Sequence, residues 1–291
     1  DAYVRVLAAA RLPLVHEWAL RAIERAHPEV IARASHASIV GMLSAPHAPT
    51  VALALAEIER RFDAAKPDLE LLRHLLADAR ADVREVGIRL LAASSAAWTA
   101  DAAAILSLLE ATDASARAAV ATSAIAAVAT MSEATKRDLV AGLLAVLARP
   151  EPEEAAHDAH AEIARSLATD IARLASMPAL LALLAAASPA AQSVGAAAIA
   201  ARADAVAELG KERVVALAVH PHALIREAGR RILDRMGFEL ASDASPLYPL
   251  LDSEWPDARA YAVEAFRTKL DPASFSLEII IGLCDSPHAD V

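Results

Sequence analysis

The chain contains 291 residues, of which 56% are apolar and 3% aromatic, a composition that excludes a disordered protein and supports a large core. Alanine is the most frequent residue and glycine occurs only 8 times, which favours closely packed helices and excludes an all-β fold. The net charge of −10 disfavours broad binding to nucleic acid or to an anionic membrane surface.

The chain opens with DAYVRVLAAARL, which contains no initiator methionine, no basic leader and no cleavage pattern. This segment reads as a helix that is already under way at Asp1. At the other end, the last repeat stops at Val291. We therefore expect the sequence to be a fragment of a longer protein that has further domains in the same chain.

A helical hairpin is predicted where leucines recur at helical spacing over residues 69–76 and the breaker DARAD follows at 78–82. The next apolar face belongs to a second helix that carries Val83, Arg84 and Gly87. One hairpin cannot cover its own apolar faces, so neighbouring hairpins must stack, and a small residue such as Gly87 lets helices approach closely.

The same pattern returns later in the chain, in HPHALIREAGRRIL, in SEWPDARAYAVEAF and in the terminal SPHADV. With the apolar residue before the arginine as an anchor, the strong and weak copies lie at Val15, Val51, Val83, Ala116, Ala155, Ala191, Ile225, Ala258 and Val291. The sequence thus predicts one array of about eight hairpins over residues 1–291, with irregular repeats at about 130–200. The breakers SAPHAP, DARAD, HPH, DSEWPD and DSPH are expected to supply turns and helix N-caps.

A polar residue, then an apolar residue and arginine, then a small residue in the middle of the second helix, resembles the HEAT repeat. The resemblance covers nearly the whole chain and implies an all-α fold, a right-handed α-α superhelix. LLDSEWPDARAYAVEAF and LCDSPHADV also resemble repeats of large bacterial HEAT proteins. The copies near Ala155 and Ala191 depart from the family pattern because they lack the arginine.

The stretch Leu174–Ala201 contains no charged residue over a length that could cross a bilayer. Pro178 and Pro189 interrupt it, and polar residues such as Gln192 lie within it. Alanine, which fills much of the rest, contributes little to membrane insertion. We predict two buried helices joined by a turn, and no membrane partner.

Arginines recur at one position of the second helix, at Arg84, Arg117, Arg226 and Arg259. Acidic residues precede the row at Asp82, Asp113 and Asp257. In HEAT arrays such residues form an arginine and aspartate ladder that satisfies loop carbonyls and fixes stacking. The alternative is a row of guanidinium groups, joined by Arg230, Arg231 and Arg235, that faces an acidic partner or phosphates.

The segment EPEEAAHDAHAE at 151–162 combines histidines with acidic residues. On a helix, Glu153 and His157 would lie one turn apart and His157 and His160 three residues apart, a pattern that can bind a divalent metal. The spacing is not that of HExxH and no cysteine is near, so an acidic, solvated helix face is expected and no metal site is assigned. His220 and His222 flank Pro221 in a turn, where capping and solvent exposure are expected.

The tryptophans are the remaining candidates for contact with a partner. Trp98 lies at a helix junction in SSAAWTAD, where we expect it to be exposed and able to anchor a partner. Trp18 and Trp255 are expected to pack inside the protein. The candidate partner-binding residues are therefore Arg84, Arg117, Arg226, Arg230, Arg259 and Trp98.

The sequence contains no glycine-rich phosphate loop, no GxSxG and no CxxC pair. We expect no catalytic, cofactor-binding or metal-binding residues, and a non-catalytic scaffold whose concave surface takes a protein partner. The alternative is a nucleic-acid-binding or repair protein that resembles HEAT-like DNA glycosylases, although the acidic charge makes this partner class less favourable. A HEAT-like bilin lyase is a third hypothesis.

The single cysteine, Cys284, cannot form an internal disulfide and is one thiol where a zinc site needs several ligands. It is expected to be a buried, small apolar residue. One unpaired cysteine fits a reducing compartment, so the expected location is the cytoplasm.

Overall fold

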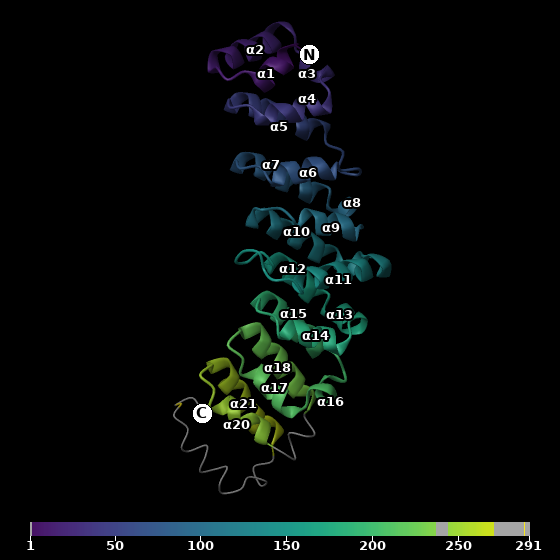
Figure 1. The fold of residues 1–291 in the computed structure, drawn as a ribbon, viewed down its shortest axis with the longest axis vertical. Coiled ribbons are helices and arrows are strands. Elements are labelled where there is room, and N and C mark those ends of the chain that lie inside the picture. The colour runs from purple at the N-terminus through teal and green to yellow at the C-terminus, as the bar shows by residue number, and fades with distance from the viewer. Residues whose placement is uncertain (1, 237–243, 271–287, 289–291) are drawn as a thin grey trace. The chain divides into compact units, whose positions relative to one another are not determined.

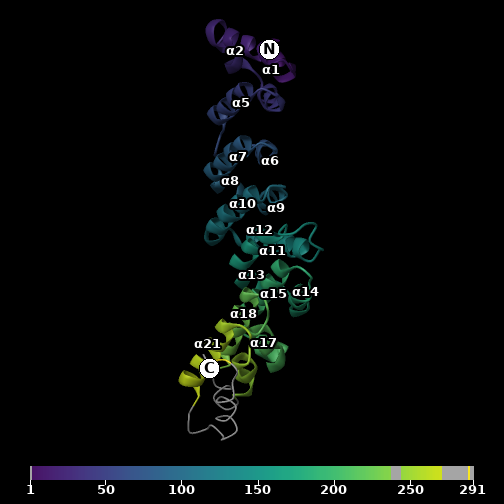
Figure 2. The same cartoon turned by 90° about the vertical axis from the view of Figure 1, so that its left-hand side faces the viewer.

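Pairs of helices packed side by side make up the fold (Figures 1 and 2). The computed structural model describes residues 2–236, 244–270 and 288. The chain divides into two compact units, Asp1–Met131 and Ser132–Val291. All regular structure in the described residues is helical, which confirms the predicted all-α class. Cys284 and the last anchor, Val291, lie outside the described residues.

The first unit contains four hairpins, each with a second helix of 13 or 14 residues. In chain order its helices are α1 (Ala2–Ala9), α2 (Pro13–Ala26), α3 (Glu29–Arg33), α4 (His36–Gly41), α5 (Ala48–Arg61), α6 (Leu69–Leu76), α7 (Ala81–Ala93), α8 (Ser95–Trp98), α9 (Ala102–Leu108) and α10 (Ala114–Ala127). The pairs α1 with α2, α4 with α5, α6 with α7 and α9 with α10 are in contact. The core of this unit lies between the helices of each pair and between neighbouring pairs.

The second unit contains four more pairs within its described residues. Its helices are α11 (Glu133–Leu147), α12 (Asp158–Ser166), α13 (Ala168–Leu174), α14 (Met177–Leu184), α15 (Pro189–Ala201), α16 (Ala205–Leu209), α17 (Lys211–Ala218), α18 (Ala223–Arg235), α20 (Tyr248–Leu251) and α21 (Pro256–Lys269). The pairs α11 with α12, α14 with α15, α17 with α18 and α20 with α21 are in contact. The prediction of about eight hairpins agrees with these eight pairs.

The second helices share a register, and this register tests the predicted anchors. They begin at Pro13, Ala48, Ala81, Ala114, Asp158, Pro189, Ala223 and Pro256. Six anchors, at 15, 83, 116, 191, 225 and 258, are the third residue of their helix. Val51 is the fourth residue of its helix, and Ala155 lies before its helix begins, so these two weak anchors were placed wrongly.

A small residue at the seventh position of the second helix lets the two helices of a hairpin approach closely. In chain order this position holds Ala19, Ala54, Gly87, Val120, Ala164, Gly195, Gly229 and Ala262, of which all but Val120 are small. At Gly229 an added Cβ would lie 2.4 Å from the backbone nitrogen of Ala218, and at Gly195 it would lie 2.9 Å from the carbonyl oxygen of Leu180. The predicted role of the small residue is confirmed at these positions.

The predicted breakers end the first helices, but their N-caps differ from the prediction. His47, Arg80, His222 and Trp255 occupy the N-cap positions and make no side-chain capping bond. Capping side chains occur elsewhere, as at Asp113, whose carboxylate accepts a hydrogen bond from the backbone N–H of Ala116. Two of these four helices, α5 and α21, have a proline in their first turn, Pro49 and Pro256 respectively. The fixed φ of proline favours helix initiation there.

The charge-free stretch Leu174–Ala201 forms the end of α13, then α14, a turn and α15, as predicted. Nine residues of α15 are buried, so this helix lies at the centre of its unit. Among the described residues no helix combines the length and apolar character needed to cross a membrane.

The acidic segment at 151–162 is not one helix. Residues up to His157 form turns, Ala155 adopts a left-handed φ of 64°, and α12 begins only at Asp158. His157 and His160 are 3% and 8% exposed, so the predicted solvated helix face is wrong for both histidines. Their ring centroids lie 6.2 Å apart with an interplanar angle of 73°, an edge-to-face arrangement.

A buried glutamate connects α5 to the preceding segment of the first unit. Glu57 is 8% exposed and accepts hydrogen bonds from Nε and Nη2 of Arg60 at 2.8 and 2.6 Å. Arg61 pairs with the same carboxylate and donates from Nη1 to the carbonyl oxygen of Ala34 at 2.6 Å. The hydrogen bonds from Arg60, followed by those from Arg61, lower the pKa of Glu57 from 4.5 to about 2 against the opposing effect of burial.

This depressed pKa predicts acid sensitivity. A carboxyl group whose folded pKa is depressed stabilises the protein above its unfolded pKa, and that contribution is lost as the pH falls from about 4.5 toward 2. Glu57→Gln should therefore lower the free energy of unfolding at pH 6 by about 2 kcal/mol. At pH 3 the difference in the free energy of unfolding between the variant and the wild type should be smaller. Urea unfolding at both pH values measures this.

The matched control is Glu59→Gln on the same helix, whose side chain is 38% exposed and pairs with Arg89. Because exposed pairs contribute little, its expected change is below about 0.5 kcal/mol at either pH. A loss for Glu57→Gln that stays the same from pH 6 to pH 3 would contradict the prediction.

Candidate functional site

The predicted arginine row is the fourth residue of the second helices. Arg84, Arg117, Arg226 and Arg259 each donate from Nη1 to carbonyl oxygens of the turn that precedes their own helix, at 2.8 to 3.0 Å. The accepting carbonyls lie five or six residues earlier, where the first helix has ended and its backbone groups need donors. The row therefore closes the turn inside each hairpin.

Two of these arginines also reach the next hairpin of their own unit. Nε of Arg84 lies 3.1 Å from Oδ2 of Asp113, and Nε of Arg226 donates to both oxygens of Asp257 at 3.0 and 3.1 Å. Arg230 donates to the same Asp257 at 2.6 Å. The predicted arginine and aspartate ladder is confirmed at these two rungs.

The arginines of the ladder lower the pKa of Asp257. Burial alone would raise the pKa of Asp257, but the hydrogen bonds from Arg230 and Arg226 outweigh it and hold the pKa below its ordinary value. The ring of Trp255 packs against Arg226, whose guanidinium carbon lies 4.5 Å from the ring centroid. Trp255 is half-buried, in agreement with the predicted packing role.

The ladder corrects the partner-binding role suggested for the row. Arg117, Arg226 and Arg259 are 8%, 6% and 8% exposed, so a partner cannot reach their guanidinium groups in this fold. Arg84 and Arg230 are more accessible but are bound to aspartates. The row stabilises the hairpins and does not form a continuous cationic surface.

Two members of the same position were missed because they are not arginines. Gln192 donates from Nε2 to the carbonyl oxygen of Ala186 at 2.8 Å, six residues earlier. Nε2 of His16 donates to the carbonyl oxygen of Ala10 at 2.8 Å, and its Nδ1 lies 2.9 Å from the hydroxyl of Thr50 in the next hairpin. The sequence signal for both residues is their position, because His16 directly follows the predicted anchor Val15 and Gln192 directly follows Ala191.

Trp98 and Trp18 exchange their expected roles. Trp98 is 2% exposed and donates from Nε1 to the carbonyl oxygen of Leu91 at 2.9 Å, so the prediction of an exposed anchor is wrong. The short α8 turns its indole back over the end of α7. Trp18 is 58% exposed, and the exposed Leu12 and Leu14 lie near it in sequence, so its predicted packing is also wrong.

The turn at 220–222 supports α18. Nδ1 of His220 accepts a hydrogen bond from the backbone N–H of His222 at 3.1 Å, and burial, followed by the charges of His222 and Arg226, lowers the pKa of His220. Both histidines are half-buried, so neither has the solvent exposure that was expected. In the part of the chain that the structure describes, no group of three or more histidine, cysteine or acidic side chains could hold a metal ion.

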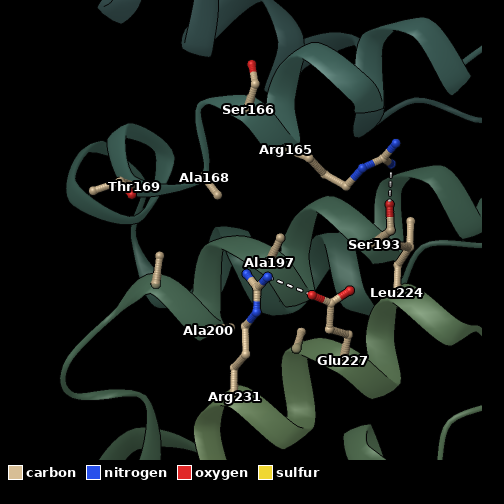
Figure 3. A pocket seen from close by; sticks show the side chains of 12 residues that line it. Arg165, Ser166, Ala168, Thr169, Ser193, Ala197, Ala200, Leu224, Glu227 and Arg231 are labelled. Carbon is tan, nitrogen blue, oxygen red and sulfur yellow. Dashed lines mark hydrogen bonds and ion pairs between the residues drawn. The ribbon is translucent and has the colours of Figure 1, made fainter. Parts of the chain in front are cut away.

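The candidate site is a pocket of about 400 Å³ in the second unit, where the second helices α12, α15 and α18 follow one another (Figure 3). Its floor is α15, which contributes Ser193 and the small side chains Ala197, Ala200 and Ala201. Because alanines replace larger residues on this face, a hollow remains between the flanking helices. We call it the α15 pocket.

Charged side chains stand on both walls of the α15 pocket. Arg165 of α12 is half-buried, and burial lowers the pKa of its guanidinium. On the opposite wall Glu227 and Arg231 of α18 form an ion pair at 2.6 Å, with Leu224 beside them (Figure 3). The pocket thus combines an apolar floor with a half-buried cation on one side and a neutral pair on the other.

Sequence reasoning gave little sign of this pocket. Arg231 was noticed only as part of a basic helix, and Arg165 was not singled out because nothing in its sequence surroundings marks it. The alanines that make the hollow look like ordinary core positions. The site depends on the stacking of three hairpins, and a periodicity within one hairpin does not reveal it.

Comparison of the sequence with models of known protein families finds no match. A search of curated proteins finds no similar sequence either.

Proposed function

We propose that this chain is a non-catalytic binding scaffold of the HEAT type, and that its second helices present the α15 pocket to a segment of a partner protein. The observation that carries the proposal is the position of the pocket, which spans α12, α15 and α18. A site that extends across three consecutive hairpins suits an extended ligand.

The side chains that hold the hairpins together differ from those that line the pocket, and this difference supports the proposal. The residues that hold the hairpins, such as Arg226, are buried and bound to loop carbonyls. Among the residues that line the pocket, Leu224 is accessible, with 40% of its surface exposed, whereas Ser193 and Ala200 are buried. A surface of this kind can be changed to suit a partner without loss of the core.

The engagement of the arginines favours a protein partner over nucleic acid. Phosphate binding requires cationic groups that face solvent in a row. Arg226 and Arg230 are bound to Asp257, Arg231 to Glu227, and Arg235 to the carbonyl oxygen of Arg202. We further propose a cytoplasmic, bacterial protein, in line with the resemblance and the single cysteine.

Filling the pocket tests this function. Ala197→Leu adds three carbons to the pocket floor and should abolish retention of a partner by the immobilised protein, because the hollow would be occupied. The measurement is an affinity pull-down from native lysate with nuclease-treated and untreated arms. A discrete protein that is retained by the wild type in both arms and is reduced at least tenfold by Ala197→Leu is the expected result.

The matched control is Ala216→Leu, the same change at an exposed position on α17, a first helix of the same unit. It should retain the partner at wild-type level. Equal retention by Ala197→Leu and the wild type would show that the pocket is not the binding site. Recovery that disappears after nuclease treatment would favour nucleic acid instead.

A further inference from the structure

The wall of the α15 pocket formed by α12 carries a guanidinium group whose donors are only partly used. Arg165 donates from Nη1 to Oγ of Ser193 at 2.9 Å, and the Ser193 hydroxyl donates onward to the carbonyl oxygen of Ala190 at 2.7 Å. This chain of bonds fixes the guanidinium at the side of the pocket. Arginine has five N–H donors in a planar fork, so four remain for a ligand.

No carboxylate among the described residues forms an ion pair with Arg165. Asp158 and Glu162, on the same helix, act on it only through space, and both are exposed to solvent. Across the pocket, the charge of Glu227 is compensated by Arg231 at 2.6 Å. Arg165 is therefore a half-buried cation that lacks a direct anionic partner.

The alanines and Leu224 suit an apolar stem, while Ser166 and Thr169 add hydroxyl groups to the lining. Ala197 and Ala200 present methyl groups along the floor, and Leu224 closes the side near α18 (Figure 3). The lining therefore places carbon atoms in the same pocket as the guanidinium group. This combination suits a short aliphatic chain that ends in an anion.

We infer that the α15 pocket binds the side-chain carboxylate of a glutamate in the partner segment, with the carboxylate on Arg165 and the methylene groups against Ala197 and Leu224. This inference rests on the proposed scaffold function and specifies its ligand chemistry. Two parallel N–H···O bonds from one guanidinium give both strength and orientation. A phosphate could also accept such bonds, but it has no stem to fill the apolar floor.

The test uses the full chain with 15N-labelled arginine and follows the Nε–Hε resonances by NMR. Glutarate, a dicarboxylate with a three-carbon stem, is titrated as the probe, beside inorganic phosphate and sodium chloride at equal ionic strength. We expect a saturable shift of the Arg165 resonance with glutarate, saturation at lower concentration than with phosphate, and no saturation with chloride.

Two variants of Arg165 and one control variant show whether glutarate binds at Arg165. Arg165→Gln should weaken glutarate binding at least tenfold, and Arg165→Lys should retain part of it, because lysine keeps the charge and loses the fork. Binding by these variants is followed through the remaining pocket resonance, that of Arg231. Arg213→Gln, an exposed position on α17, should bind like the wild type. Circular dichroism confirms that each variant is folded, and Arg165→Lys decides the question if Arg165→Gln does not fold.

An unchanged titration in Arg165→Gln, or saturation by phosphate at an equal or lower concentration, would overturn the inference. The proposed scaffold function and the inference about the carboxylate can each fail while the other holds. A partner that is lost in Ala197→Leu while glutarate does not bind supports the scaffold and contradicts the carboxylate. Glutarate binding without any retained partner supports the pocket chemistry and contradicts the scaffold.

Discussion

Replacing Gly229 with alanine is expected to lower the free energy of unfolding by about 3 kcal/mol, because the new methyl group overpacks a rigid contact. Its Cβ would lie 2.4 Å from the nitrogen and 2.7 Å from the Cα of Ala218, both backbone atoms of α17. The helices α17 and α18 would have to separate. Urea unfolding followed by circular dichroism measures the loss.

The expected loss of stability in Gly229→Ala is opposite to the intrinsic helix preference of the two residue types. Alanine is favoured over glycine in a helix by about 1 kcal/mol, so an unhindered site should show a gain. Gly41 provides that control: it ends α4, and a Cβ there meets no atom within 4 Å. Gly41→Ala should be neutral or slightly stabilising. If both variants were stabilised, the close approach at Gly229 would not exist in solution.

Replacing Arg226 with methionine is expected to lower the free energy of unfolding by about 3 kcal/mol, because buried acceptors lose their donor. The carbonyl oxygens of His220 and Pro221 accept hydrogen bonds from Arg226 at 3.0 and 2.8 Å. Methionine fills a similar volume but donates nothing. Asp257 keeps Arg230 as its partner, which limits the loss. Thermal and urea unfolding, followed by circular dichroism, measure it.

Arg231→Met is the matched control on the same helix. Arg231 is 68% exposed and pairs with Glu227 four residues earlier, a kind of contact worth only about 0.3 to 0.5 kcal/mol. The two substitutions remove the same charge and differ in burial and in backbone contacts. Similar losses for both would mean that the ladder contributes no more than an exposed ion pair.

The hairpins could be predicted because their signals are local. Apolar spacing, breakers and the arginine of each second helix lie within one 33-residue stretch, so Ile225, Arg226 and Gly229 suffice to place α18. The weak copies were harder. Val51 was chosen as an anchor because it is apolar, whereas the third position of α5 is Thr50, which is buried although it is polar.

The acidic segment shows why local reasoning also fails. Counting turns from Glu153 assumed that the helix already ran there, but the left-handed backbone at Ala155 delays it to Asp158. The start of α12 therefore lies 44 residues after that of α10, whereas the start of α10 lies 33 after that of α7. Nothing in EPEEAAHDAHAE gives this delay without the three-dimensional packing of α11.

The site was less predictable than the fold because its properties come from neighbours that are distant in sequence. The pocket at Arg165, for example, depends on alanines of the next hairpin. A residue type indicates which bonds a side chain can make. It does not indicate whether a partner or the same chain takes them.

The shared fourth position has a consequence for how such a chain can change its length over evolutionary time. At this position of six second helices an arginine, a glutamine or a histidine reaches a carbonyl six residues earlier, so these six hairpins carry their own means of closing the turn. Duplication or excision of one repeat length, such as 81–113, which runs from the start of one second helix to the start of the next, would join segments that keep this bond and the small seventh residue. Gain and loss of complete repeats should therefore be tolerated far better than insertions of a few residues within a second helix.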